Sequence, residues 1–238
     1  QNTGFFWILL SIVLYGGLHS LLASNRVKGF TARLVGGNAY RRFYRLFFSI
    51  TGGITFLPTL ALVALLPDRT IYAIPMPWVL VTRLIQVVAL LGLAYGILQT
   101  GAFAFVGITQ ALHGAGREKL VTTGLYRWVR HPLYTCTLAF LWLASPITWN
   151  LFALNLGVTA YFWIGSIFEE RKLVQQFGQG YEEYRVKTPR MIPKIKISPS
   201  GRQPELNRCV ALINLLTQGE PGINETSLIF FERDWSLK

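Results

Sequence analysis

Long apolar runs, separated by short basic segments, limit the fold of this chain more than any other feature. Residues 4–23, 46–66 and 78–98 are each long enough to cross the hydrocarbon core of a bilayer as one helix. Residues 132–168 carry no charged side chain and are too long for a single span. Four such runs indicate a membrane protein whose backbone crosses the bilayer as helices.

The fourth run divides at Ser145-Pro146, a dipeptide that is typical of turns. We therefore expect two short helices, 132–146 and 149–168, that form a hairpin. The sequence thus predicts an all-α polytopic integral membrane protein with about five transmembrane helices, the last two as a helical hairpin.

Composition supports a membrane protein over a soluble one. Hydrophobic residues make up 52% of the 238 residues and charged residues only 14%, whereas soluble domains carry about 25% charged residues. The net charge of +12 is of the kind seen in nucleic-acid-binding proteins. However, the basic residues lie between apolar runs and not on one polar domain, so we expect a lipid bilayer as partner and no nucleic acid.

The basic segments also predict the orientation. With five spans, the basic segments 25–45 and 99–131 and the stretch after residue 168 all fall on one side of the membrane. The other side receives residues 67–77 and the Ser145-Pro146 turn. The positive-inside rule then places the C-terminus in the cytoplasm and the N-terminus outside, in what we expect to be a bacterial inner membrane. The first run lacks a basic leader, so we interpret it as a retained span.

Two domains are expected. Residues 1–196 form the membrane domain, with a functional region at 120–194, and residues 197–238 are a linker and a tail of unassigned role. Residues 169–194 are dense in charged and aromatic side chains. Within this stretch, the part around Phe177–Arg190 is predicted to cover the functional region on the cytoplasmic side.

Charged clusters stand at both ends of the predicted hairpin. Arg130 and His131 precede it, and Glu169, Glu170 and Arg171 follow it. Because a hairpin returns to the face from which it started, both clusters are expected to meet at one point. Four tyrosines flank the clusters: Tyr126, Tyr134, Tyr181 and Tyr184.

The mixed charge suits a zwitterionic cofactor. The guanidinium of Arg130 is a planar fork that matches a carboxylate, and the two glutamates suit an ammonium group or ribose hydroxyls. S-adenosylmethionine carries these groups and a sulfonium, which tyrosine rings stabilise by cation–π attraction. We therefore predict an S-adenosylmethionine site with no metal. His131, Arg130 and Tyr134 are assigned catalytic roles, with His131 as a proton acceptor; the predicted cofactor contacts are Arg130, His131, Tyr126, Tyr134, Glu169, Glu170, Arg171, Tyr181 and Tyr184.

A plainer interpretation stays open for each cluster. Arg130 and His131 also fit as basic flanks of a span with Pro132 in the first helical turn. Glu169 and Glu170 also fit a solvated helix end. Their placement on either side of one uncharged hairpin favours a shared site.

Residues 120–193 contain a pattern of several parts: Gly124 and Tyr126, Arg130-His-Pro-Leu-Tyr134, Glu169-Glu-Arg-Lys-Leu173, Phe177-Gly178, Tyr181 and Tyr184, and Pro189. With this pattern, the segment resembles the catalytic region of the isoprenylcysteine carboxyl methyltransferase family and its phospholipid methyltransferase relatives. The resemblance implies a methyltransferase in which Arg130, His131, Glu169 and Glu170 bind S-adenosylmethionine.

The first half more loosely resembles bacterial methanethiol S-methyltransferases and NnrU-like membrane proteins, through residues 18–23, 27–28, 40–44 and 103–107. A small thiol is therefore expected as methyl acceptor alongside a lipophilic one of the isoprenylcysteine or phospholipid kind. The oligomeric state is left open.

Two alternative functions follow from the same residues. An NnrU-like isomerase would hold haem through histidines, and His19, His113 and His131 are the three available. A non-catalytic membrane subunit would carry a decayed site. The complete Arg-His-Pro and Glu-Glu set favours the methyltransferase. We expect His19 to be a hydrogen-bonded structural residue near the interface and Cys136 to be a small packing residue.

Overall fold

The computed structural model describes residues 4–114 and 119–193. The chain divides into two units, Gln1–Lys194 and Ile195–Lys238, and every described residue belongs to the first. The linker and tail that we expect at 197–238 lie outside the described residues.

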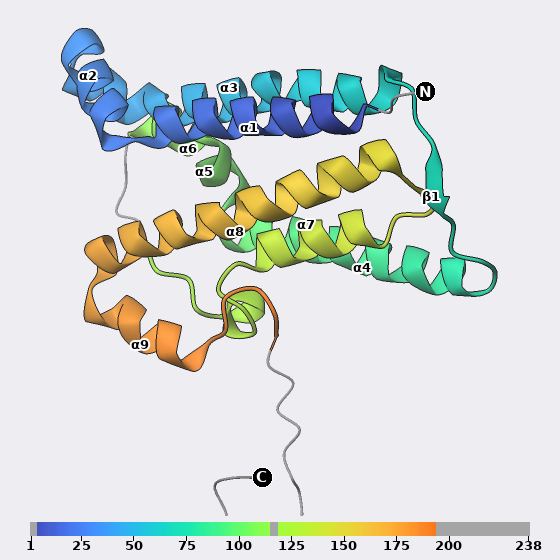
Figure 1. Cartoon of the computed structure of the whole chain (residues 1–238). Helices are drawn as coiled ribbons and strands as arrows, with labels where there is room; N and C mark the ends of the chain where they lie inside the picture. Colours follow the sequence, from blue (N-terminus) through green and yellow to red (C-terminus); the bar gives the residue numbers. More distant parts are fainter. Residues whose placement is uncertain (1–3, 115–118, 194–238) are drawn as a thin grey trace, which may run out of the picture. The chain divides into compact units, whose positions relative to one another are not determined.

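The described chain is almost entirely helical (Figure 1). Two short strands, β1 (Thr70–Tyr72) and β2 (Ile147–Thr148), pair antiparallel. The helices are α1 (Phe5–Ala23), α2 (Asn25–Val35), α3 (Gly37–Leu65), α4 (Trp78–Gln99), α5 (Ala102–Val106), α6 (Ile108–His113), the 3₁₀ helix η1 (Gly124–Arg127), α7 (Pro132–Trp142), α8 (Trp149–Phe177) and α9 (Gln179–Lys187).

The predicted all-α membrane fold is confirmed, with one span shorter than expected. Within the described residues, α1, α3, α4 and α8 are long and apolar enough to cross a membrane. Helix α7 has only 11 residues, or about 17 Å at 1.5 Å per residue, against a hydrocarbon core of about 30 Å. It ends at Trp142 and not at 146, because the chain turns after Leu143 and enters β2.

The predicted basic loop at 25–45 is helical instead. Ser24 caps α2 by accepting a hydrogen bond from the backbone N–H of Val27, which satisfies one free donor at the helix start. Gly36 then separates α2 from α3 with a φ of +83°, a conformation that glycine adopts without steric cost. Helix α3 therefore begins nine residues before the expected start of the second span, and its first turns carry Arg41 and Arg42.

Successive spans run in opposite directions, as the predicted topology requires. At one end, β1 pairs with β2 and the N–H of Gly4 donates to the carbonyl of Pro67. At the other end, Lys172 Nζ donates to the carbonyl of Ala23. The start of α1 thus lies beside the start of α8, and the end of α1 lies beside the charged end of α8.

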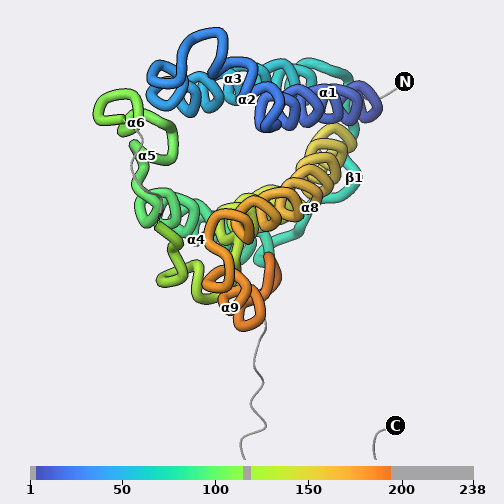
Figure 2. The backbone as a smooth tube through the Cα atoms, turned by 90° about the vertical axis from the view of Figure 1, so that its left-hand side faces the viewer, coloured from blue at the N-terminus to red at the C-terminus, as the bar shows by residue number. Residues whose placement is uncertain are grey.

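Helix α1 packs against α3 and α8, and α4 packs against α7. Figure 2 shows α1 and α3 in one row of helices and α4 and α8 in another. A buried cluster joins α1 to α8 through Ile8, Ile12, Ala153, Leu154 and Val158. Helices approach closely in membranes where small residues face a neighbour.

Glycines permit these close approaches. A Cβ on Gly157 of α8 would lie 2.5 Å from Cδ1 of Ile12, and a Cβ on Gly92 of α4 would lie 3.0 Å from Sγ of Cys136. Cys136 is therefore a packing residue between α7 and α4, as predicted.

The outer faces of the long helices expose large apolar side chains, for example Phe6 and Leu65. Contiguous apolar surface of this kind needs an apolar solvent, and in a helix of this length that solvent is lipid. The protein is an integral membrane protein.

Candidate active site

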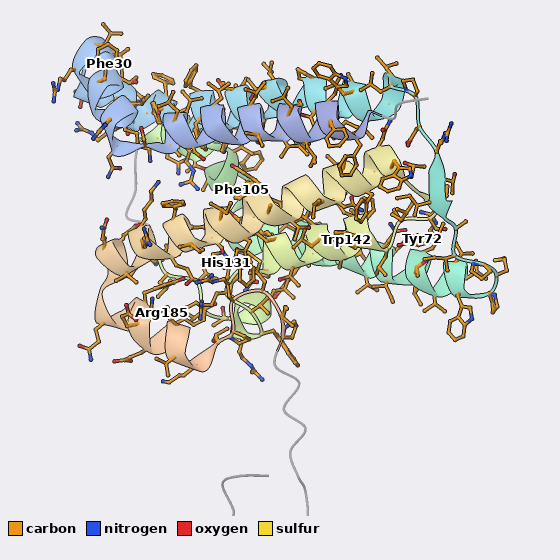
Figure 3. The ribbon with its side chains drawn as sticks, in the orientation of Figure 1. Phe30, Tyr72, Phe105, His131, Trp142 and Arg185 are labelled. Atoms are coloured by element: carbon orange, nitrogen blue, oxygen red, sulfur yellow. The ribbon has the colours of Figure 1, made fainter. Side chains whose placement is uncertain are left out.

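The start of α7 lies directly on the segment that follows α9. The backbone N–H groups of Arg130 and His131 donate to the carbonyls of Pro189 (2.9 Å) and Arg190 (3.0 Å). One helical turn later, the Thr135 hydroxyl donates to the carbonyl of Met191 (2.7 Å). Figure 3 shows His131 at this junction, below α8. The charged stretch after the last span therefore folds back onto the Arg-His-Pro segment.

A buried carboxylate is the centre of the site. The side chain of Glu170 is 4% exposed, and it receives both guanidinium groups of the site. Arg130 contacts Oε1 through Nε (2.9 Å) and Nη2 (2.8 Å), and Arg190 bonds Oε1 through Nε (3.1 Å) and Oε2 through Nη2 (3.2 Å). His131 Nε2 lies 3.1 Å from Oε1. A buried charge is stable only with this kind of pairing.

The guanidinium of Arg130 also ties the tail in place. Its Nη1 donates to the carbonyls of Arg185 (2.7 Å) and Thr188 (2.6 Å). Of its five N–H donors, at least four are thus engaged within the protein. Arg130 joins α7, α8 and the end of α9 at a single point.

Glu169 differs sharply from its neighbour. Its side chain is 47% exposed, although Oε2 accepts a 2.9 Å hydrogen bond from the Tyr134 hydroxyl. The same oxygen lies 3.6 Å from His131 Nδ1. Since successive residues of a helix point about 100° apart, one carboxylate is buried in the ion cluster and the other remains accessible.

Three rings form a stack from the ion cluster into the helix bundle. The rings of His131 and Tyr134 are nearly parallel, with centroids 5.3 Å apart and 3° between planes. Tyr134 in turn stacks on Phe162 of α8, with centroids 4.4 Å apart and 15° between planes. The stack fixes the orientation of the imidazole beside both glutamates.

The other three tyrosines surround the cluster. The Tyr184 hydroxyl donates to the carbonyl of Tyr126, which joins α9 to η1. Tyr181 is almost fully buried, and its hydroxyl has no hydrogen-bond partner among the described residues. Burial, and then the charge of Glu170, raises the pKa of Tyr181 to about 12. Its hydroxyl is therefore a neutral donor at physiological pH.

The structure brings together most of the residues that the sequence singles out. Arg130, His131, Tyr134, Glu169 and Glu170 are in direct contact. Burial and then the charge of Glu169 raise the pKa of Tyr126 to about 12. Arg171 lies apart, with its exposed guanidinium over the ring of Phe168 at 5.5 Å.

Arg190 and Phe162 were not predicted as site residues. Arg190 supplies the second guanidinium to Glu170 and lies over the ring of Trp163 at 5.6 Å. Arg190 directly follows Pro189, the last residue of the motif, and this position was the sequence feature that could have indicated its role. Phe162 lies inside an apolar run and carries no signal of its own.

The remaining histidines lie in different surroundings. His19 stacks on Tyr15 at 5.5 Å and contacts the ring of Phe48 at 4.2 Å. Its Nδ1 is buried and has no hydrogen-bond partner among the described residues. The expected hydrogen bond is thus absent at this nitrogen, because aromatic rings pack around the imidazole. His113 is the last residue of α6.

Residues 83–180 match the phospholipid methyltransferase family. The matched segment includes η1, α7, α8 and five charged or histidine residues of the predicted site. The matched segment ends just before Tyr181, so the segment that follows α9 and carries Arg190 lies outside the match.

Curated relatives are also methyltransferases. The chain is 27% identical over 198 residues to methanethiol S-methyltransferase 1 of Bradyrhizobium diazoefficiens, covering 78% of this chain and 65% of the relative. It is 31% identical over 105 residues to methanethiol S-methyltransferase of Pseudomonas deceptionensis, covering 42% and 40%. It is 33% identical over 131 residues to human protein-S-isoprenylcysteine O-methyltransferase, covering 50% and 43%.

The chain spans less than two thirds of the length of each of these three relatives. The similarity includes relatives whose names give a sulfur acceptor and relatives whose names give an oxygen acceptor, so it does not distinguish the acceptor. Together, the segment 83–180, which is less than half of the chain, and these relatives confirm the predicted resemblance to the phospholipid and isoprenylcysteine methyltransferases.

Proposed function

We propose that this protein transfers the methyl group of S-adenosylmethionine to a small thiol or another lipophilic acceptor at the membrane. One observation supports the proposal most strongly. An accessible carboxylate, Glu169, is held beside His131 and Tyr134 by a buried ion cluster, within a segment of the methyltransferase family.

The polar groups at the site fit this cofactor. The buried Tyr181 hydroxyl has no partner within residues 4–114 and 119–193, and a buried hydroxyl without a partner is rare in folded proteins, so we propose that the cofactor supplies one. Glu169 is free to accept hydrogen bonds from an ammonium group or a ribose. Arg190, whose side chain is 29% exposed, retains donors for a carboxylate.

We assign the site residues to two groups. Glu169, Tyr181, Tyr134, Tyr126 and Arg190 would contact the cofactor. Arg130, Glu170 and Tyr184 have their polar atoms engaged within the protein, so we propose that they position the first group. Arg171 contributes charge to this end of α8 without a contact to the cluster.

Bound S-adenosylmethionine supplies an electrophilic methyl group on a sulfonium sulfur, which becomes a neutral thioether after transfer. The acceptor must lose a proton as its new bond to carbon forms. His131 is placed to take that proton. In the tautomer whose Nε2–H donates to Glu170, Nδ1 carries no proton and can accept one, and Glu169, 3.6 Å from Nδ1, would stabilise the positive charge that results.

The protein's further contribution is alignment. Methyl transfer requires the nucleophile, the methyl carbon and the leaving sulfur in line, and fixed geometry of this kind lowers a barrier by several kcal/mol. The ring stack of His131, Tyr134 and Phe162 is a rigid support for such an arrangement.

We further propose that the site lies on the cytoplasmic side of a bacterial inner membrane. The basic residues at the start of α3 and after α8 lie at the same end as Lys172 and Ala23. The positive-inside rule assigns that end to the cytoplasm. The N-terminus would then be outside.

Titration of the purified full chain with S-adenosylmethionine tests the proposal. Calorimetry should detect binding, and incubation with methanethiol should release dimethyl sulfide in amounts that follow the enzyme concentration. The Glu169→Gln variant should bind the cofactor more weakly. Failure of the parent protein to bind the cofactor would refute the proposal, and a Soret absorption band without binding would instead support the haem alternative.

A further inference from the structure

A cavity of about 270 Å³ lies among α1, α3, α7 and α8. Its walls come from all four helices, with Tyr15 on α1, Phe56 on α3, Thr137 on α7 and Val158 on α8. Apolar and aromatic side chains dominate the lining. All four helices are apolar, so the cavity lies in the part of the protein that lipid surrounds.

One side chain is shared between this cavity and the charged site. Phe162 lines the cavity, and its ring stacks on Tyr134 with centroids 4.4 Å apart. Tyr134 donates to Glu169 and stacks on His131. A single tyrosine ring therefore lies between the cavity wall and the proton acceptor that we propose.

The polar groups of the lining are few. The Thr137 hydroxyl donates to the carbonyl of Leu133 within its own helix, which leaves Tyr15 and Tyr161 as the lining residues with phenol hydroxyls for a guest. Among the described residues, no charged side chain lines the cavity. A charged guest would lose its hydration without gaining a counter-charge, so the chemistry selects an uncharged molecule.

The volume limits the size of that molecule. An apolar cavity of about 150 Å³ in a protein core binds benzene, so 270 Å³ accommodates an apolar guest of roughly ten non-hydrogen atoms. A diacyl lipid exceeds this volume several times over, and a prenyl chain of 15 to 20 carbons exceeds it roughly 1.5- to twofold. The cavity thus favours the small end of the acceptors that the family resemblance allows.

We propose that this cavity holds the methyl acceptor, and that the acceptor is a small, uncharged, apolar thiol which reaches the site from the bilayer. The inference rests on the proposed function and adds the place and size limit of the acceptor. Phe162 and Tyr161 would form the wall that faces the cofactor site, and Val158 would limit the length of the acceptor.

A cavity-filling variant tests the size limit. Val158→Phe should lower kcat/KM for 1-octanethiol, whose nine non-hydrogen atoms nearly fill the cavity, at least tenfold and leave kcat/KM for methanethiol within threefold. Leu156→Phe is the matched control, because Leu156 is on the same helix with an exposed side chain, and it should leave both values unchanged. Leu154→Ala, which enlarges the cavity, should raise kcat/KM for 1-dodecanethiol, which is longer than the parent cavity allows. Equal losses with every thiol, or none, would overturn the proposal.

A binding experiment separates this proposal from the proposed function. The apolar photoreactive probe 3-trifluoromethyl-3-phenyldiazirine should label cavity residues such as Tyr161. Excess 1-butanethiol should suppress that labelling and leave the labelling of lipid-facing residues unchanged. Labelling of the cavity that persists with 1-butanethiol, or that never occurs because a lipid chain fills the space, would refute acceptor binding there. Neither result depends on cofactor binding or methyl transfer.

Discussion

Arg130 Nε donates a 2.9 Å hydrogen bond to Oε1 of Glu170, across 40 positions of the chain. Arg130 precedes α7 and Glu170 lies in the last turns of α8, so this bond closes the hairpin at its charged end. The same carboxylate also receives Arg190 from the segment after α9. Three separate stretches of sequence therefore depend on one buried anion.

Glu170→Gln should lower the stability of the protein even when no ligand is bound. The amide preserves the shape of the side chain but leaves Arg130 and Arg190 without their shared counter-charge. Removal of one partner of a buried ion pair costs about 3–5 kcal/mol. We expect the free energy of unfolding to fall by an amount near the lower end of this range. Denaturant titration in detergent measures this change. A variant as stable as the parent would show that the cluster contributes little.

Glu169→Gln should leave the stability of the protein nearly unchanged and weaken cofactor binding. Because its side chain is half exposed, the free energy of unfolding should change by less than about 1 kcal/mol. Loss of a charge-assisted hydrogen bond to the cofactor should cost about 1.5–3 kcal/mol, or roughly tenfold to 150-fold in affinity for S-adenosylmethionine. Glu183→Gln, an exposed carboxylate on α9, is the control and should bind like the parent. Equal affinities in all three proteins would exclude Glu169 as a ligand.

Arg130→Lys should release the segment after α9. Lysine keeps the charge but cannot reach Glu170 and the carbonyls of Arg185 and Thr188 at the same time. Hydrogen exchange should therefore accelerate at the amide of His131, which donates to the carbonyl of Arg190. Arg127→Lys, an exposed residue of η1, provides the control. Unchanged protection of His131 would mean that the backbone pairing alone holds the segment.

The tyrosine pair of α9 offers a test of cofactor contact. Tyr181→Phe removes a buried hydroxyl without a partner, so the unliganded protein should keep or gain stability. Tyr184→Phe removes the hydrogen bond to the carbonyl of Tyr126 and should cost about 1 kcal/mol. If Tyr181 donates to the cofactor, only Tyr181→Phe should weaken cofactor affinity at matched stability. Destabilisation by Tyr181→Phe would indicate that its hydroxyl has an unrecognised structural partner.

The fold was predictable because hydrocarbon thickness sets helix length. The apolar runs located α1, α3, α4 and α8, and the uncharged hairpin brought His131 and Glu169 together. The length of α7 was not predictable, since apolar composition continues past Trp142 while the backbone already turns. Helix α2 was missed because its basic residues were interpreted as a loop between spans, although the segment is amphipathic.

It was harder to predict the role of each site residue than to predict which residues form the site. Glu169 and Glu170 are adjacent, and helix periodicity did not decide which of them is buried. That choice depends on Arg190, which reaches Glu170 only because the chain folds back after α9. Long-range contacts of this kind leave no periodic pattern in the sequence. The same holds for Phe162, whose importance comes from the ring that stacks on it.

The orientation in the membrane gives the last prediction. The loop between α3 and α4 pairs with the turn before α8 through β1 and β2, while the ion cluster lies near the opposite end of α8. A reporter inserted within residues 68–76 should therefore be on the far side of the inner membrane, and one fused after residue 196 should be cytoplasmic. Alkaline phosphatase, active only outside the cytoplasm, and a fluorescent protein that matures in the cytoplasm would report the two sides. Because S-adenosylmethionine is made in the cytoplasm, a far-side signal from the C-terminal fusion would separate the proposed cofactor site from its supply and would contradict the topology and the function together.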